Sequence, residues 1–226
     1  MKDSGIAWLG EVPEHWQVTY LKRLVSKIGS GKTPLGGSEV YVDDGVLFLR
    51  SQNVYDEGLR LEDAVFIAPD VDQSMLNTRV QPGDILLNVT GASIGRACLV
   101  PDDFPPANVN QHVCIIRLVE MSQRKFIASV MKSDLIKNQV SIAQTGAARE
   151  GLNFDQLGNF VFVLPPSDEQ AAITAFLDRE TAKLDALAAE AQRGIELLKE
   201  RRSALISAAV TGKIDVRETV VTPLTA

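Results

Sequence analysis

The sequence contains few of the residues that build metal sites and disulfide frameworks. Among its 226 residues there are two cysteines and two histidines, too few for a convincing zinc cluster. Cys98 and Cys114 lie within apolar, strand-like runs, where a cysteine ordinarily packs as a small hydrophobic side chain. We therefore expect neither a metal site nor a disulfide bond.

Long apolar runs are also missing. No run of eighteen apolar residues occurs, and a membrane-spanning helix requires about that many. The N-terminal segment, MKDSGIAWLGEVPEHW, lacks the apolar stretch of a signal peptide. We expect a soluble protein without membrane contact, with the cytoplasm as its location.

Positive charge is in the minority. The chain has 23 basic and 29 acidic residues, a net charge of −6, of which residues 1–166 contribute −4 and the remainder −2. Indiscriminate binding to nucleic acid depends on a basic surface that neutralises phosphates, so this composition argues against it. A local basic patch is compatible with the composition, and a partner protein would then supply much of the attraction to DNA.

Motifs for catalysis are incomplete. Gly31-Lys32-Thr33 resembles the end of a phosphate-binding loop, but the first glycine of that motif is replaced by Ser26. Gly91-Ala-Ser-Ile-Gly95 has the spacing of a hydrolase nucleophile elbow, yet neither histidine lies in a convincing triad context. A hydrolase is left as an alternative that an esterase assay of a Ser93 variant would test. We expect no catalytic residue.

The stretch from Ser167 to Gly212 predicts one long helix. Pro165 and Pro166 precede Ser167 as N-cap, Gln170 follows three residues later, and Gly212 is a stop signal. At about 1.5 Å per residue the helix would be roughly 65 Å long. Its apolar stripe is too long for the preceding domain to cover, and the chain has no second helix of that length.

Apolar residues along this helix recur in steps of three and four, as in a coiled coil, with interruptions at Glu180, Gly194 and Arg201. We predict that two copies pair antiparallel as a homodimer. The alternatives are a helix folded back on its own domain and a hairpin broken near Gly194. The predicted dimer interface consists of Ile173, Leu177, Leu184, Leu187, Leu198 and Leu205.

The first 166 residues predict a strand-rich domain, so the fold class is α+β with one long coiled-coil helix. A helical turn is expected at Leu21–Ile28 and an exposed loop at Gly29–Gly37. Residues 122–144 predict two short helices divided near Ser133. Residues 167–213 form the helical segment and 214–226 a tail. The predicted strands are residues 16–21, 46–50, 59–67, 84–90, 96–101, 113–119 and 160–164.

Several segments, in order along nearly the whole chain, carry a likeness to a known family. They are GIAWLGEVPEHWQV from Gly5, FLRSQNVY from Phe48, QPGDILLNVTGASIGR from Gln81, NVNQH from Asn108, LPPSDEQAAI from Leu164 and LISAAVTGKIDVR from Leu205. The chain resembles the specificity subunits of type I restriction-modification systems. This resemblance implies a target recognition domain over residues 1–166, followed by a conserved-region helix, in a protein that selects a DNA sequence without performing chemistry.

The same resemblance implies partners and an unusual stoichiometry. Family members usually carry two recognition domains and two helices in a chain about twice this long, so this one resembles a half-subunit. Two copies would read identical, inverted half-sites separated by about 34 to 70 Å of DNA. The expected partners are double-stranded DNA, a methylating subunit that uses S-adenosylmethionine and a restriction subunit that hydrolyses ATP. This chain itself should bind neither cofactor.

Candidate DNA-contacting residues are polar side chains on loops, because base edges are read by directional donors and acceptors. Lys32 and Thr33 suit phosphates, and Arg149 suits guanine. A solvated or structural turn is the alternative at each position, especially at Asn53, Asn110 and Gln111. The full set is Lys32, Thr33, Arg50, Gln52, Asn53, Thr90, Ser93, Arg96, Asn110, Gln111, Thr145 and Arg149.

The exposed side of the long helix is a hypothetical docking surface for the methylating subunit. Two further classes of function are left open as alternatives. A coiled-coil scaffold that binds protein predicts no protection of DNA, and a fragment of a fused restriction-methylation enzyme predicts a catalytic segment upstream. The residues proposed for docking are Arg179, Lys183, Arg193, Glu196 and Lys199.

Overall fold

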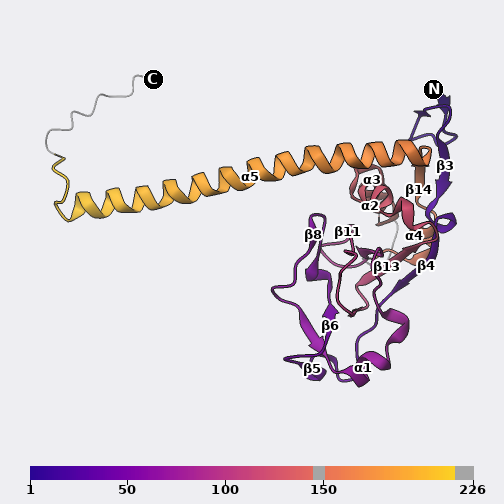
Figure 1. The fold of residues 1–226 in the computed structure, drawn as a ribbon, viewed down its shortest axis with the longest axis horizontal. Helices are drawn as coiled ribbons and strands as arrows, with labels where there is room; N and C mark the ends of the chain where they lie inside the picture. The colour runs from indigo at the N-terminus through magenta and orange to yellow at the C-terminus, as the bar shows by residue number, and fades with distance from the viewer. Residues whose placement is uncertain (145–150, 217–226) are drawn as a thin grey trace. The chain divides into compact units, whose positions relative to one another are not determined.

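The computed structural model describes residues 1–144 and 151–216 (Figure 1). The chain divides into two units, Met1–Thr174, which we call the head, and Ala175–Ala226. The head combines strands with short helices, and one long helix follows the last strand, as expected for the predicted α+β class. Among the described residues, no helix is long and apolar enough to cross a membrane.

A four-stranded antiparallel sheet lies at the centre of the head. Leu86 and Ile115 face one core cluster, whereas Ile85, Leu87 and Ile116 face another that includes residues of the following helices. Because both faces are covered, β10 is buried along its whole length. In sheet order the strands are β11 (Ala97–Leu99), β10 (Ile85–Asn88), β13 (Val113–Leu118) and β4 (Val25–Ser30); the helices are α2 (Arg124–Lys132), α3 (Asp134–Gln144) and α4 (Phe154–Gly158).

A second four-stranded sheet completes the head. Its β12 runs parallel to β6, and the other pairs are antiparallel. The order is β12 (Ala107–Val109), β6 (Val46–Leu49), β9 (Val65–Ile67) and β5 (Tyr41–Val42). The remaining elements are α1 (Pro69–Gln73) and the pairs β1 (Lys2–Asp3) with β2 (Glu11–Val12), β3 (Gln17–Tyr20) with β14 (Val161–Leu164), and β7 (Val54–Tyr55) with β8 (Gly58–Leu59).

Two predicted elements are wrong. A 3-10 turn covers only Leu21–Arg23, whereas Val25–Ser30 form β4, which pairs with β13 and includes the first two residues of the expected exposed loop. The predicted strand over residues 59–67 is divided, because β8 pairs with β7 while β9 pairs with β6 and β5. The two helices divided at Ser133 are confirmed.

Helix α5 (Ser167–Val210) is continuous, so the alternative of a hairpin broken near Gly194 is wrong. A mid-helix glycine costs about 1 kcal/mol relative to alanine, which a 44-residue helix tolerates. Its end is the predicted glycine stop: Gly212 has φ +70°, and the Gly212 and Lys213 amides donate to the Ala209 and Ala208 carbonyls.

The first two turns of α5 belong to the head, which therefore extends to Thr174 rather than ending at residue 166. Gln170 is buried, and its Nε2 donates to the Pro165 carbonyl over 2.9 Å, so the side chain secures the segment before the helix. Glu169 accepts a hydrogen bond from Trp16 Nε1 and contacts His15 Nε2. These contacts attach the N-terminal aromatic segment to the start of the helix.

Two buried carboxylates of the head, Asp72 and Asp84, are paired with arginines. Asp84 accepts two hydrogen bonds of 2.8 Å from Arg117. Arg79 donates hydrogen bonds to Asp72 and, together with a bond from Asn108, holds the pKa of that carboxyl below its usual range against the opposing effect of burial. The ionised form of Asp72 is therefore the one that the fold stabilises.

Cys98 and Cys114 are free and buried, as predicted. Burial raises the pKa of each thiol to about 12, so both are protonated near neutral pH and act as small apolar side chains. Within residues 1–144 and 151–216 there is no cluster of side chains that could hold a metal ion.

Candidate nucleic-acid interface

The strand register brings the predicted loops to one edge of the central sheet. Asn88 at the end of β10 lies opposite Val113 at the start of β13, and Cys114 lies opposite Ser30 at the end of β4. Leu87 pairs with Ala97 at the start of β11. Strand ends therefore meet on one side of the sheet, namely the ends of β4 and β10 and the starts of β11 and β13. We call this side, from which the connecting loops leave, the loop edge.

The second sheet adds the end of β6 to the loop edge. Val109 pairs with Leu49 in parallel register, and the Asn110 amide donates to the Leu49 carbonyl over 2.9 Å. The segments after β6 and β12 consequently start side by side. The loop edge thus gathers the sequence-predicted residues Lys32, Thr33, Arg50, Gln52, Thr90, Ser93, Arg96, Asn110 and Gln111.

A chain of hydrogen bonds joins three loops of this edge. Thr33 Oγ1 donates to Gln111 Oε1, and Gln111 Nε2 lies 3.1 Å from His112 Nε2. The other ring nitrogen, His112 Nδ1, contacts Thr90 Oγ1. The Asn110 side chain accepts from the His112 amide over 3.1 Å, which fixes the turn that presents Gln111 and His112. Thr33, Thr90 and Gln111 are therefore one structural group.

Close packing of the backbone holds the glycine-rich loop against this group. The Gly31 amide donates to the Val113 carbonyl over 3.1 Å. A Cβ at Gly31 would lie 1.7 Å from the Val109 carbonyl oxygen, so only glycine fits. Lys32 follows immediately, and its Nζ donates to the Ser74 carbonyl over 3.2 Å.

A second group is centred on an aromatic ring. The guanidinium carbon of Arg60 lies 3.8 Å from the centroid of the Tyr55 ring, and that of Arg96 lies 4.7 Å from it. Both distances are in the range of cation–π attraction. The contacts hold two positively charged side chains beside the loop edge, where phosphates could be bound.

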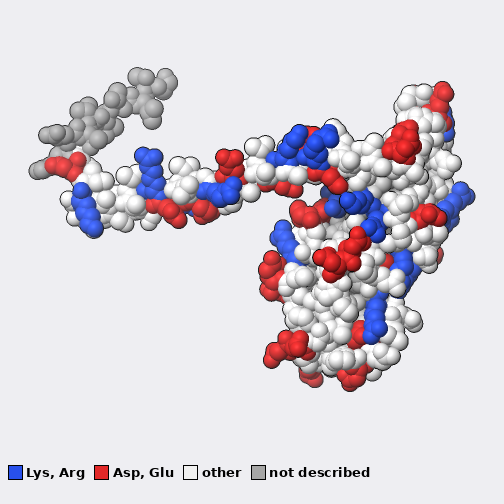
Figure 2. All heavy atoms as spheres, viewed as in Figure 1, with Lys and Arg blue, Asp and Glu red and all other residues white. Residues whose placement is uncertain are grey.

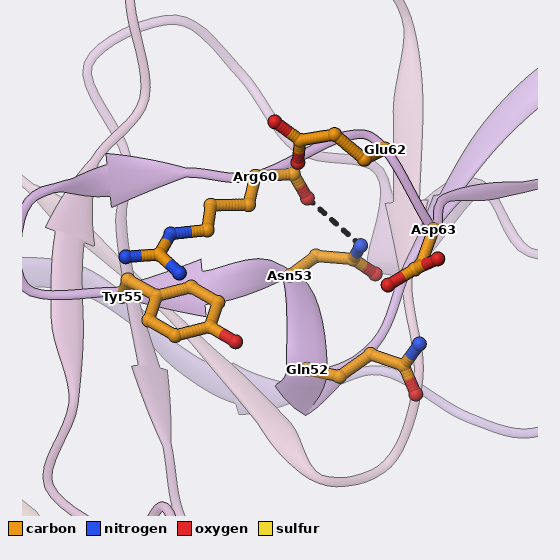
Figure 3. Close-up of a pocket in the computed structure, with 6 residues that line it drawn as sticks. All are labelled: Gln52, Asn53, Tyr55, Arg60, Glu62 and Asp63. Carbon is orange, nitrogen blue, oxygen red and sulfur yellow. Dashed lines mark hydrogen bonds between the residues drawn. The ribbon is translucent and has the colours of Figure 1, made fainter. Parts of the chain in front are cut away.

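A cavity of about 310 Å³ lies beside this ring, and Figure 3 shows the residues that line it. Arg60 lies over Tyr55, and the side chains of Gln52, Glu62 and Asp63 come from the surrounding loops. Amide and carboxylate oxygens of this kind accept hydrogen bonds from base amino groups. Gln52 is exposed and is placed as a candidate for base contact.

Asn53 has a structural role instead, so its prediction as a base-reading residue is wrong. It is 1 % exposed. Its Nδ2 donates to the Arg60 carbonyl over 2.9 Å, and its Oδ1 accepts from the Arg50 amide over 2.9 Å. The turn alternative is the correct one, because this side chain connects the two strands that border the cavity.

Arg50 and Ser93 are anchored at the loop edge. Arg50 Nη2 donates to the Asp63 carbonyl over 2.6 Å. Ser93 Oγ accepts from Asn88 Nδ2 over 3.0 Å. In the described part of the chain the two histidines pair with Thr90 and Glu169 rather than with Ser93, so the hydrolase alternative has no triad.

Thr145 and Arg149 lie outside the described residues. Gly151, which follows them, forms a β-bridge with Thr90 at the loop edge.

On the face of the head shown in Figure 2, basic and acidic side chains are interspersed. This face of the head is therefore not broadly basic, in agreement with the composition.

Comparison with known proteins identifies the family. Residues 13–197 match the family model described as "Type I restriction modification DNA specificity domain". The chain belongs to the type I restriction-modification specificity family. It is 23% identical over 209 residues to the EcoKI specificity subunit of Escherichia coli strain K12, covering 91% of this chain and 44% of that one. It is 27% identical over 213 residues to the MjaVIII specificity subunit of Methanocaldococcus jannaschii, and this match covers 92% of this chain and 48% of that one.

Solved structures from type I restriction-modification systems share the fold. A chain from a structure describing assembly and conformational transition of a type I system matches with a TM-score of 0.65 and 19% identity, covering 88% of this chain and 47% of that one. The HsdS subunit from Thermoanaerobacter tengcongensis matches with a TM-score of 0.57 and 20% identity, covering 79% and 40%. This specificity-family chain thus spans less than half the length of these relatives.

The predicted dimer interface on α5, a seam of six apolar side chains at heptad spacing, has two parts in this specificity-family chain. Ile173 packs against the core of the head, so it is not available as an interface residue. Farther along α5, Leu177 is 36% exposed, and Leu184, Leu187, Leu198 and Leu205 are 51 to 65% exposed. These five leucines keep the heptad spacing on an unbroken helix and stay candidates for pairing.

Three residues at the site were missed in the sequence. His112 follows the predicted Gln111, and its adjacency to two polar loop residues was the available signal. Tyr55 and Arg60 gave no such signal, because their association depends on the β7–β8 hairpin. The spatial grouping of the candidate site therefore could not be predicted from loop composition alone.

Proposed function

We propose that the chain is a non-catalytic, DNA-reading half of a type I specificity subunit. The head reads one half-site of a bipartite DNA target through its loop edge. The observation that carries this proposal is the convergence of four polar loop segments on the loop edge of a doubly covered sheet: those after β4 and β6 and those that connect β10 with β11 and β12 with β13. Loops positioned by a rigid scaffold are the usual carriers of recognition. The cytoplasm, where the DNA of a bacterial or archaeal cell lies, is the expected location.

We further propose that α5 pairs antiparallel with a second copy. The exposed leucines from Leu177 to Leu205 supply an apolar seam, and a twofold axis would place two identical heads on inverted half-sites. The rebuilt dimer would contain two heads and two helices, which is in keeping with relatives about twice as long.

The methylating and restriction subunits are the proposed protein partners, and S-adenosylmethionine and ATP would be bound by them. Salt bridges already connect several charges on α5 within the helix, including Lys183 with Glu180 and Lys199 with Glu196. Exposed pairs of this type contribute little to stability. They can therefore be exchanged for contacts with a partner helix at small cost.

Charge reversal at Arg193 and Lys199 is expected to abolish copurification with the cognate methylating subunit, because the docking helix would then meet like charges. The isolated variant should keep the thermal unfolding midpoint of the wild type. Reversal of the exposed Lys2 in β1 is the control and should leave copurification intact. Undiminished capture of the Arg193 and Lys199 variant would contradict the docking surface.

The DNA-reading role is tested by substituting Arg60 and Arg96 singly with glutamine. Each variant, in complex with the methylating subunit, should bind target duplex several-fold more weakly. The slope of log affinity against log salt should fall by about one for each lost phosphate contact. Lys2→Gln is the matched control. Sequencing of methylated bases in cells that express the complex defines the target, and a wild-type complex that methylates no defined motif would refute the proposal.

A further inference from the structure

Gln111 lies at the centre of the hydrogen-bonded chain that joins three loops. Thr33 Oγ1 donates to Gln111 Oε1 over 2.5 Å. Gln111 Nε2 lies 3.1 Å from His112 Nε2, and His112 Nδ1 lies 2.5 Å from Thr90 Oγ1. Both ends of the Gln111 amide are therefore held, one by the loop after β4 and the other by the ring of His112.

The protons along this chain follow from the chemistry of each group. An amide nitrogen only donates, so His112 Nε2 must accept. A neutral imidazole then carries its proton on Nδ1 and donates it to Thr90 Oγ1. If the Gln111 amide turned over, its oxygen would face His112 Nε2, so the imidazole proton would have to move to Nε2 and both threonine hydroxyls would exchange their donor and acceptor roles. The network therefore couples the orientation of the amide to the tautomer of His112.

Gln111 retains hydrogen-bonding capacity beyond this network. The network uses one N–H and one oxygen lone pair, whereas a primary amide has two of each. One donor and one acceptor are left on a side chain that is exposed. In the major groove adenine presents an acceptor, N7, beside a donor, the N6 amino group, and a glutamine amide can bind both.

We propose that Gln111 reads an adenine at one position of the half-site, and that Thr33 and His112 are positioning residues that fix which end of the amide donates. This inference rests on the proposed function and adds the identity of one base. Without the network, the amide could present either orientation, and the bond pair to adenine would compete with the reversed arrangement. Thr33 and His112 thus act on base preference through Gln111.

The test uses the complex with its methylating subunit and a randomised duplex DNA library, and the retained duplexes are sequenced. Thr33→Val and His112→Leu remove the donor and the acceptor that hold Gln111, whereas Thr33→Ser and His112→Gln keep them. The wild type, Thr33→Ser and His112→Gln should prefer adenine at one motif position. Thr33→Val and His112→Leu should lose about tenfold of that preference at this position alone. Gln111→Glu should shift the preference toward cytosine, whose amino group donates.

The exposed Gln73 in α1 supplies the control, and Gln73→Ala should leave the motif unchanged. An unchanged motif in Thr33→Val and His112→Leu, or an equal loss at every position, would overturn the inference. A wild-type complex with no sequence preference would instead refute the proposed function. Nitrogen-15 chemical shifts of the His112 ring give a second test on the folded wild type: a proton on Nδ1 is expected, and a proton on Nε2 would overturn the assigned orientation.

Discussion

Leu198→Asp is expected to convert a dimer of about 49 kDa into a monomer of 24.6 kDa and to abolish sequence-specific methylation by the complex. Leu198 is 65% exposed and lies on the predicted seam of α5. In an antiparallel pair each copy would bury an aspartate against apolar side chains, and an unpaired buried charge costs several kcal/mol. Light scattering coupled to size-exclusion chromatography measures the mass.

The neighbouring Leu197 provides a matched control for this prediction. It is 66% exposed, so its substitution removes the same kind of exposed side chain, yet it lies off the seam by about 100° of helix rotation. Leu197→Asp should remain a dimer and support methylation. Equal masses for the two variants would show that the seam does not determine assembly.

Asp84→Ala is expected to lower the free energy of unfolding by about 3 kcal/mol, because it leaves Arg117 without its carboxylate. The Asp84 side chain is 1% exposed and that of Arg117 is 22% exposed. Lys27 lies in the same environment: burial lowers its pKa first, Arg117 lowers it further, and Asp84 opposes both effects. Removal of Asp84 should therefore lower the pKa of Lys27 further and leave two cations without compensation.

Asp102→Ala is the surface counterpart. Asp102 pairs with Arg124 over 2.7 Å, but its side chain is 70% exposed, and pairs of this kind contribute at most about 1 kcal/mol. Urea unfolding followed by circular dichroism compares the two variants. A similar loss of stability in both would mean that burial of the Asp84 pair does not determine its contribution.

Much of the fold was predictable because its signals are local. Val113–Leu118 alternates between two buried clusters, and an apolar run of that length predicts a strand. The glycine stop of α5 depends only on residues near Gly212. In contrast, residues 21–28 carry an ambiguous local pattern, and pairing of β4 with β13, about ninety residues away, determines the outcome.

The candidate site was predictable as a set of loops but not as an arrangement. Polar character and loop position identified Thr33, Thr90 and Gln111, and the strand register then brought them together. Asn53 has the same composition signal, yet its amide is bonded to the backbone. Sequence cannot separate these cases, because an asparagine that holds a turn and one that contacts a base occupy similar loops.

Gly31 sets a limit on how this protein could be re-engineered. Its Cα faces the Val109 carbonyl so closely that any side chain would force the glycine-rich loop away from β12. Farther along the loop, Gly36 and Gly37 have φ of +96° and +61°, which favour glycine, and a Cβ at Gly36 would lie 2.7 Å from the Val40 side chain. A library designed to change the target would therefore keep these three glycines constant and vary exposed residues such as Lys32 and Thr33.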